Sequence, residues 1–452
     1  MTIDIGSRRE LFLDDHLIES TDGVALRLHR PTPRDVAIVH DRPWEGNTCF
    51  YHTVFRDGDR VRMYHRGSHS SDNEKLAHQV VCYAESSDGK TFSKPELGII
   101  DFDGSKANNV VWDDEIGSHN FAPFRDDNPQ CDPAARYKAM GSKGMEALYA
   151  FKSSDGIHWS FLREEPVVTD GAFDSQNLAF WDTERGLYVD YHRDFYVVDE
   201  EKIRGIRTAT SDDFFDWTEP LWLDYGEAPH EHLYINQITP YYRAPHIYLG
   251  FPKRYMPKRA ESDGGNAGLS DSVFMSSRDG LHFRRWGEAF IRPGPQQERW
   301  INRNNQIAWG LIETAAEVPG TPPEISVYSM EGYYRGDSCQ LRRYTLRLDG
   351  FVSANAPLRG GELVTRPFTF AGTELSLNFA TSAAGSVRVE IQEETGQAVE
   401  GFAMAQCEEI YGDDVDRVVR WERGSDAGAL SGKPVRLRFH LSDADLYSLV
   451  WR

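Results

Sequence analysis

The sequence predicts an all-β chain in which a five-bladed β-propeller precedes a smaller β-sandwich. A short Asp-centred turn followed by an aromatic side chain recurs five times, alternation of apolar and polar residues typical of strands dominates, and helical periodicity is scarce. The turns are 57 to 70 residues apart, which is the size of a four-stranded antiparallel sheet with its loops. Their aspartates are Asp88, Asp155, Asp212, Asp279 and Asp349.

Each repeat is predicted to be one blade. Hairpin patterns over residues 51–66, 180–192 and 238–251 lie upstream of a turn, as expected if three strands precede the turn into the outermost strand. In the turns, Ser and Asp side chains would bind backbone amides and glycine would adopt a positive φ, so we assign the turns a structural role. The predicted blades cover residues 36–100, 101–168, 169–225, 226–292 and 293–355.

Two further segments complete the predicted fold. Residues 10–19 have the pattern of a strand, which we place beside the last blade because a propeller must protect the edge between its first and last blades. Residues 356–452 contain about six to eight short alternating strands, typical of a β-sandwich. The predicted domains are therefore residues 1–355 and 356–452.

The composition limits the classes of partner. The 452-residue chain has a formal net charge of −21, which argues against nucleic acids and anionic membranes as partners. The five cysteines are scattered without a C-x-x-C pair and predict reduced thiols. Because the sequence starts without a signal peptide and has no membrane-spanning run, we expect a cytoplasmic protein. We expect no cofactor, and a homo-oligomer is left open.

Five polar segments, one ahead of each hairpin, are predicted to be the innermost strands and to line a central pocket. Burying such polar groups is costly unless they bind one another or face a wet cavity. The carboxylates there are Glu45, Asp174 and Glu231. Amides, histidines and aromatic rings around them would suit a sugar. The predicted substrate-binding residues are Trp44, Asn47, His119, Asn120, Gln176, Asn177, Asp194, His230, His232, Tyr234, Asn236 and Arg303.

Paired carboxylates are what cleavage of a glycosidic bond requires. One protonates the leaving oxygen, while the other attacks the anomeric carbon or activates water. We predict Asp174 and Glu231 as this pair, with Glu45 as the rival for either role. The motif His230-Glu231-His232 also raises the question of a metal ion. In a strand, Glu231 points away from both histidines, so we predict no catalytic metal.

The blade segments also resemble a known group of enzymes. The repeat count, the polar segments and the trailing sandwich resemble the five-bladed propeller glycosidases of glycoside hydrolase families 32, 43 and 68. Segments 12–15, 43–48, 119–124, 172–177 and 231–234 are similar to those of uncharacterised bacterial proteins related to family 32. The similarity spans nearly the whole chain and implies a propeller with glycosidase activity.

The chain departs from the characterised families in one respect. They present an acidic residue on each of blades one, two and three, whereas blade two of this chain offers His119 and Asn120 instead. The family's catalytic roles therefore cannot be transferred as a set. We predict an exo-acting glycoside hydrolase that removes a terminal sugar from short oligosaccharides. A glycoside phosphorylase on the same fold and a non-catalytic sugar-binding propeller are the alternatives.

Overall fold

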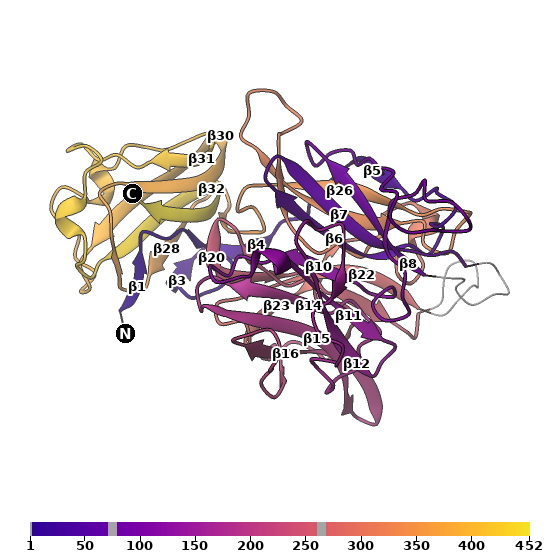
Figure 1. Ribbon diagram of the computed structural model, residues 1–452. Coiled ribbons are helices and arrows are strands. Elements are labelled where there is room, and N and C mark those ends of the chain that lie inside the picture. The colour runs from indigo at the N-terminus through magenta and orange to yellow at the C-terminus, as the bar shows by residue number, and fades with distance from the viewer. Residues whose placement is uncertain (1, 71–78, 260–267) are drawn as a thin grey trace. The chain divides into compact units, whose positions relative to one another are not determined.

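The computed structural model describes residues 2–70, 79–259 and 268–452, whose regular secondary structure consists of β-strands and four short 3-10 helices (Figure 1). The chain divides into two compact units. One is Pro31–Thr345, and the other combines Met1–Arg30 with Leu346–Arg452. The domain boundary therefore differs from the predicted one, since the N-terminal residues join the C-terminal unit. Within the described ranges, no helix has the length and apolarity needed to cross a membrane.

Five antiparallel sheets make up the unit Pro31–Thr345, which confirms the predicted five-bladed propeller. Inner strands such as β7 and β8 are buried along most of their length, as expected for sheets that pack against neighbouring blades. Blade 1 contains β6 (Phe50–Asp57), β7 (Arg60–Gly67), β8 (Val80–Ser86) and β9 (Val110–Trp112); blade 2 contains β10 (Ala122–Arg125), β11 (Tyr137–Lys143), β12 (Ala147–Ser153) and β13 (Ser160–Phe161); blade 3 contains β14 (Leu178–Asp182), β15 (Leu187–Val198), β16 (Glu201–Ser211) and β17 (Leu221–Trp222).

The last two blades are built differently from the first three. In blade 4 the second strand is broken into two pieces, which pair with successive parts of the third strand. Blade 4 contains β18 (His232–Leu233), β19 (Thr239–Tyr241), β20 (Ala244–Gly250), β21 (Lys253–Met256), β22 (Leu269–Ser277) and β23 (Phe283–Ile291). Blade 5 contains β24 (Ile312–Thr314), β25 (Glu324–Glu331), β26 (Gln340–Arg347) and β5 (Thr32–Val39).

The strand that closes the propeller lies further along the chain than predicted. Strand β5 pairs antiparallel with β26 and completes blade 5. Residues 10–19 belong to the other unit instead, where β2 (Glu10–Leu11) pairs with β32 (Arg436–Trp451). An N-terminal strand does cover the edge of the last blade, as predicted. Both residues 10–19 and β5 have the sequence pattern of a strand, and the sequence alone does not show which of them pairs with β26.

Four of the Asp-centred turns join the third and fourth strands of their blades, as predicted. In the turn at Asp155, the carboxylate accepts hydrogen bonds from the amides of Ile157 and His158, at 2.8 Å each. In blade 3 the equivalent residue is Asp213 rather than Asp212, and Phe214 occupies the glycine position with a φ of 71°. The repeat tolerates this because the Ser211 hydroxyl still binds the Phe214 amide.

The fifth turn is not a blade turn. Asp349 lies in the C-terminal unit, where its buried carboxylate accepts hydrogen bonds from Ser448 Oγ at 2.6 Å and Asn378 Nδ2 at 3.0 Å. Arg9 forms an ion pair with the same oxygen at 3.3 Å. The Asp349 side chain therefore connects three segments of that unit.

Tyrosine hydroxyls connect neighbouring blades through these turns. Tyr64 in β7 donates to the carbonyl of Gly156 in blade 2 at 2.8 Å, and Tyr191 in β15 donates to that of Gly280 in blade 4 at 2.8 Å. Tyr328 in β25 donates in the same way to Gly89 in blade 1. A Cβ at Gly156 would lie 2.8 Å from the Tyr64 hydroxyl oxygen, so glycine also permits the close approach.

We expect Tyr64→Phe to lower the free energy of unfolding by about 1–2 kcal/mol, because it leaves the buried carbonyl of Gly156 without its donor. Tyr411→Phe is the matched control, since Tyr411 is 64% exposed and should change stability by less than about 0.5 kcal/mol. Denaturant unfolding of both variants measures the difference. Equal stability of the two would show that the contact between blades contributes nothing.

The second unit has its own hydrophobic core, which includes Phe12, Trp421, Phe439 and Trp451. Its strands β30 and β32 are long, and their pairing shifts register between Asn378 and Phe379 and again between Thr381 and Ser386. The N-terminal strands, in indigo, join its sheets (Figure 1). The strands are β1 (Ile3–Gly6), β2, β3 (Ile18–Asp22), β4 (Ala25–Leu28), β27 (Val352–Ala356), β28 (Gly361–Thr365), β29 (Phe368–Phe370), β30 (Leu375–Gln392), β31 (Asp413–Val418) and β32.

Candidate functional site

The polar segments ahead of the hairpins are mostly turns and loops rather than the strands that the sequence predicted. Residues 117–120 and 302–305 are turns, and within these segments residues 122–124 of β10 and His232–Leu233 lie in strands. Several residues adopt positive φ, among them Gln237 at 48° and Arg303 at 74°. Such loops have backbone groups outside any sheet, and these groups need hydrogen-bond partners.

The amides predicted to bind substrate provide these partners. Gln176 Nε2 donates to Thr53 Oγ1 at 3.0 Å, and its Oε1 accepts from Gln237 Nε2 at 2.9 Å. Asn120 Nδ2 donates to the carbonyls of Phe173 and Ser175 at 2.6 Å each. The amide side chains of this kind, all at most 7% exposed, are Asn47, Asn120, Gln176, Asn177 and Asn236. Their bonds hold the loops in place, so we do not include them in the candidate site.

A set of charged and aromatic side chains from all five blades meets around Asp174. Because every blade contributes, the set lies where the blades converge at the propeller axis. We call it the axial cluster, and it comprises Tyr51 and Arg66 from blade 1, His119 from the segment before blade 2, Asp174 and Arg193 from blade 3, Tyr234 and Lys253 from blade 4, and Arg303, Tyr333 and Tyr334 from blade 5.

Asp174 is the carboxylate of the axial cluster. Its side chain is 39% exposed and forms an ion pair with Arg193, which is buried. The hydroxyls of Tyr51 and Tyr234 lie 3.0 Å and 3.2 Å from its backbone carbonyl and 2.8 Å from one another. The loop at Asp174 is therefore held firmly, while its carboxylate remains open to solvent.

Cations outnumber carboxylates in the axial cluster. Arg303 donates to the hydroxyls of Tyr333 and Tyr334 at 2.9 Å and 2.7 Å. Lys253 lies 4.1 Å from the centre of the Tyr234 ring and donates to Asn302 Oδ1 at 3.1 Å. Among the described residues, these two side chains have only neutral partners. Burying cations without counter-ions is costly, so the arrangement favours an anionic group on a ligand.

Burial and the neighbouring cations also change the protonation of the axial cluster. Burial lowers the pKa of Lys253 well below its usual value, and Arg303, Arg204 and Arg193 lower it further. Burial likewise lowers the pKa of His119, with added repulsion from Arg66, Arg303 and Arg193. An arriving anion would reverse this repulsion and favour the charged forms.

Glu45 does not reach the axial cluster through any contact among the described residues. Its side chain is fully buried, and its Oε1 accepts from His65 Nε2 at 2.8 Å. Its other oxygen is paired with Lys94 and accepts from the Arg42 amide at 3.2 Å. Trp44, beside it, donates from Nε1 to Asn109 Oδ1 at 2.6 Å. Both residues border a separate cavity of about 540 Å³ near blade 1.

Glu231 and His230 lie in another cavity, of about 280 Å³, between blades 3 and 4. Arg254 Nη1 lies 3.2 Å from the Glu231 carboxylate, and Arg285 forms a second ion pair with it. His230 Nδ1 lies 3.1 Å from the Tyr196 hydroxyl. The predicted carboxylates Glu45, Asp174 and Glu231 therefore have separate sets of partners.

Two more predicted residues lie among neighbours outside the axial cluster. His232 Nδ1 accepts from the Arg204 amide at 3.3 Å, and its Nε2 lies 3.7 Å from Glu201. Asp194 is paired with Arg207 at 3.0 Å. His230 and His232 thus have different partners, and the two histidines do not share one site.

Sequence reasoning missed most cations of the axial cluster. Arg66 lies near the end of β7, Arg193 lies in β15, and Lys253 begins β21. Each lies on the second strand of a blade, whereas the predicted site residues, apart from Asp194 in β15, come from the segments around the first strand. These strands contain other charged residues as well, so the sequence offers no clear signal for which of their cations is buried at the axis.

Comparisons with known proteins find similar folds at low sequence identity. No protein-family model matches the chain, and no curated protein is similar to it. Similar solved structures include a glycosyl hydrolase from Bacteroides ovatus, with 13% identity, a TM-score of 0.43, and coverage of 74% of this chain and 93% of its own length. The catalytic domain of the Coprinopsis cinerea GH62 α-L-arabinofuranosidase has 11% identity and a TM-score of 0.43, covering 70% of this chain and 97% of its own length.

A third similar structure comes from the GH130 family of mannoside phosphorylases, described as containing glycoside hydrolases that target β-1,2 mannosidic linkages in Candida mannan. It has 13% identity and a TM-score of 0.37, covering 71% of this chain and 94% of its own length. At such identities and TM-scores, the likeness carries no argument about the reaction or the substrate. The resemblance to families 32, 43 and 68 remains a prediction.

Proposed function

We propose that the protein cleaves glycosidic bonds at the axial cluster, with Asp174 as its catalytic carboxylate. The observation that carries the proposal is the convergence of side chains from all five blades around one partly exposed carboxylate. The hydroxyls of Tyr234 and Tyr334 and the His119 imidazole supply groups that can bind sugar hydroxyls. We retain exo-acting hydrolysis of short oligosaccharides as the proposed reaction.

Glu231 is omitted from this proposed site. Two guanidinium groups, from Arg254 and Arg285, bind its carboxylate, and the cavity that it borders contains no residue of the axial cluster among its described lining residues. A second acid for hydrolysis would have to come from the substrate, from water or from another side chain near Asp174. Glu231→Gln should therefore leave kcat within about threefold of the wild type, because Glu231 has no role in the transition state.

The cation excess supports a second candidate, a glycoside phosphorylase. In phosphorolysis, phosphate attacks the anomeric carbon in place of water, the glycosidic C–O bond breaks, and one acid protonates the leaving oxygen. The products are a sugar phosphate and an alcohol, so a single carboxylate is enough. Arg66, Lys253 and Arg303 together resemble the basic pocket that phosphate needs.

One assay separates the candidates. The purified full chain is incubated with short oligosaccharides, neutral and uronate-containing, with and without inorganic phosphate, and products are identified by mass spectrometry. A hydrolase releases free sugar in both buffers, whereas a phosphorylase releases sugar phosphate only when phosphate is present. Binding of a sugar without any turnover would instead indicate a non-catalytic propeller and would contradict the proposal.

Arg303→Met should raise the KM for the anionic substrate, or for phosphate, by about 10- to 100-fold, because it removes a charged hydrogen-bond donor. The kcat should change much less, since the contact is made equally before and during the reaction. Arg60→Met is the control, because Arg60 is 49% exposed and pairs with Glu85 at the edge of blade 1. An unchanged KM in Arg303→Met would exclude Arg303 from binding.

A further inference from the structure

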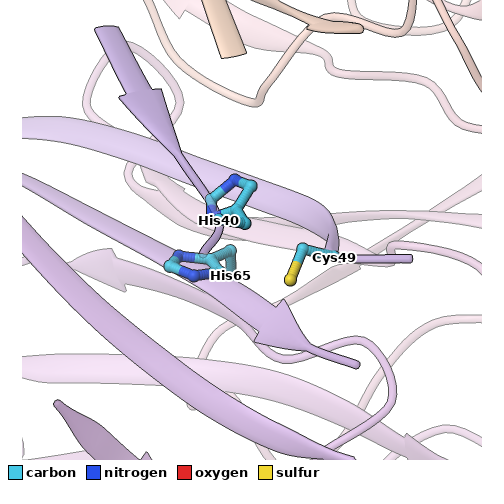
Figure 2. Close-up of side chains that lie close together, drawn as sticks. All are labelled: His40, Cys49 and His65. Atoms are coloured by element: carbon cyan, nitrogen blue, oxygen red, sulfur yellow. The ribbon is translucent and has the colours of Figure 1, made fainter. Parts of the chain in front are cut away.

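A second group of reactive side chains lies buried where the propeller closes. His40 directly follows β5, the strand that completes blade 5, while Cys49 directly precedes β6 and His65 lies in β7 of blade 1. The three side chains lie side by side, with donor atoms within 4.8 Å of one another (Figure 2). Their exposed fractions are 0%, 0% and 1%. None belongs to the axial cluster.

The hydrogen bonds of His65 leave one ring nitrogen available. His65 Nε2 lies 2.8 Å from Glu45 Oε1, and an ionised carboxylate can only accept, so Nε2 carries the proton. His65 Nδ1 is then an unprotonated nitrogen, and it is buried without a hydrogen-bond partner among the described residues. Such a buried acceptor is costly to leave unsatisfied unless a ligand binds it.

The hydrogen bond between His65 and Glu45 is of a kind that is common at protein metal sites. A histidine that ligates a metal commonly donates its other ring N–H to a carboxylate, which fixes the tautomer and the ring orientation. Glu45 is positioned to do this for His65. His40 Nε2 lies 2.9 Å from His52 Nε2, while its Nδ1 makes only a long 3.5 Å contact with Glu45.

Metal ions bind cysteine as thiolate and histidine as neutral imidazole, so binding of an ion would displace the proton of the Cys49 thiol. That thiol donates only a long 3.8 Å hydrogen bond, to the carbonyl of Ser68.

We propose that His40, Cys49 and His65 bind a zinc-type divalent ion, with Glu45 orienting His65. Two nitrogens and one sulfur form a borderline-soft donor set that suits zinc. Zinc bond lengths imply donor atoms about 3.5 Å apart, so the ligands move together by about an ångström on binding.

The position gives the ion a structural role. It would connect the end of β5 in blade 5 to β6 and β7 in blade 1, and so fasten the first blade to the last. Closed propellers need such a fastening because their ends are otherwise held only by side-chain packing and one strand. Glu45 and Ser68, which contact His65 and Cys49, also border the cavity beside Trp44.

Metal analysis and cobalt spectroscopy of the full chain test the proposal. The protein is purified without a metal-affinity tag, its metal content is measured, and the ion is removed and replaced by Co²⁺. We expect one ion per chain and a thiolate-to-cobalt charge-transfer band. Cys49→Ser should lose the band, and Glu45→Gln should weaken affinity by about 10- to 100-fold. Cys407→Ser changes a buried cysteine of the other unit, so this variant should retain the charge-transfer band and the cobalt affinity.

Any of three outcomes would overturn the proposal. They are an absence of bound Co²⁺ and Zn²⁺ in the wild type, a cobalt spectrum without a thiolate band, and a Cys49→Ser spectrum identical to that of the wild type. If Cys49→Ser does not fold, the cobalt spectrum of the wild type and the cobalt affinity of His65→Gln still test the proposal. His65→Gln is expected to lower cobalt affinity at least about 10-fold, because it removes a ligand.

Discussion

Asp174→Asn should lower kcat for the best glycoside substrate by about 100- to 10,000-fold, the range that a positioned acid, base or nucleophile contributes. Asparagine has nearly the same shape and keeps the backbone contacts with Tyr51 and Tyr234, so the loop should stay in place. It cannot ionise, attack carbon or transfer the proton. Steady-state kinetics and a melting curve for each protein measure the change.

Asp170→Asn is a demanding control for this variant. Asp170 lies four residues earlier, is also paired with an arginine, Arg207 at 2.9 Å, and is 63% exposed. It shares residue type and ion pairing with Asp174 but makes no contact with the axial cluster among the described residues. Its substitution should leave kcat unchanged. Equal kcat values in the two variants would remove Asp174 from the catalytic role.

Glu45→Gln should lower the free energy of unfolding by about 1.5–3 kcal/mol, because it removes charged hydrogen bonds from the Lys94 ammonium and the Arg42 amide. Lys94 keeps its ion pair with the exposed Asp41 at 3.0 Å, which limits the loss. Glu96→Gln, a substitution two residues from Lys94 and outside this ion pair, should change stability by less than about 0.5 kcal/mol. Denaturant unfolding of both variants, without added metal, measures the effect.

The same carboxylate predicts a pH dependence. Burial would raise the pKa of Glu45, but hydrogen bonds from His40 and His65 outweigh it and hold the pKa well below its ordinary value of 4.5. A group with a lowered pKa in the folded state stabilises the fold above its unfolded pKa and loses that contribution at lower pH. The stability difference between wild type and Glu45→Gln should therefore be constant above about pH 5 and shrink in more acidic solution.

Much of the fold was predictable because it follows from local chemistry. The Asp-centred turn at Asp155 uses hydrogen bonds between residues at most three apart, and hairpins such as β6–β7 pair neighbours along the chain. Two features depend on distant partners and were predicted wrongly. The turn at Asp349 has a similar sequence but a different environment, and β5 rather than residues 10–19 closes the last blade.

The candidate site was less predictable because it depends on partners distant in sequence. The polar segments correctly indicated the region of the propeller axis, but most of their Asn and Gln side chains donate to backbone carbonyls there. Gln176 and Asn120 look like sugar-binding residues in sequence, but their partners, such as Tyr51 and Phe173, show them to be framework. Only the folded chain distinguishes an amide that holds a loop from one that can bind a ligand.

The sequence by itself determined the repeat, the all-β architecture and the segment that carries Asp174, since each depends on residue types within one blade. The tertiary structure decided which carboxylates have which partners. It paired Asp174 with Arg193, placed Glu45 among histidines at the closure of the ring, and bound Glu231 to two arginines. The physical reason is that a side chain's charge, exposure and protonation are set by neighbours that only folding brings together.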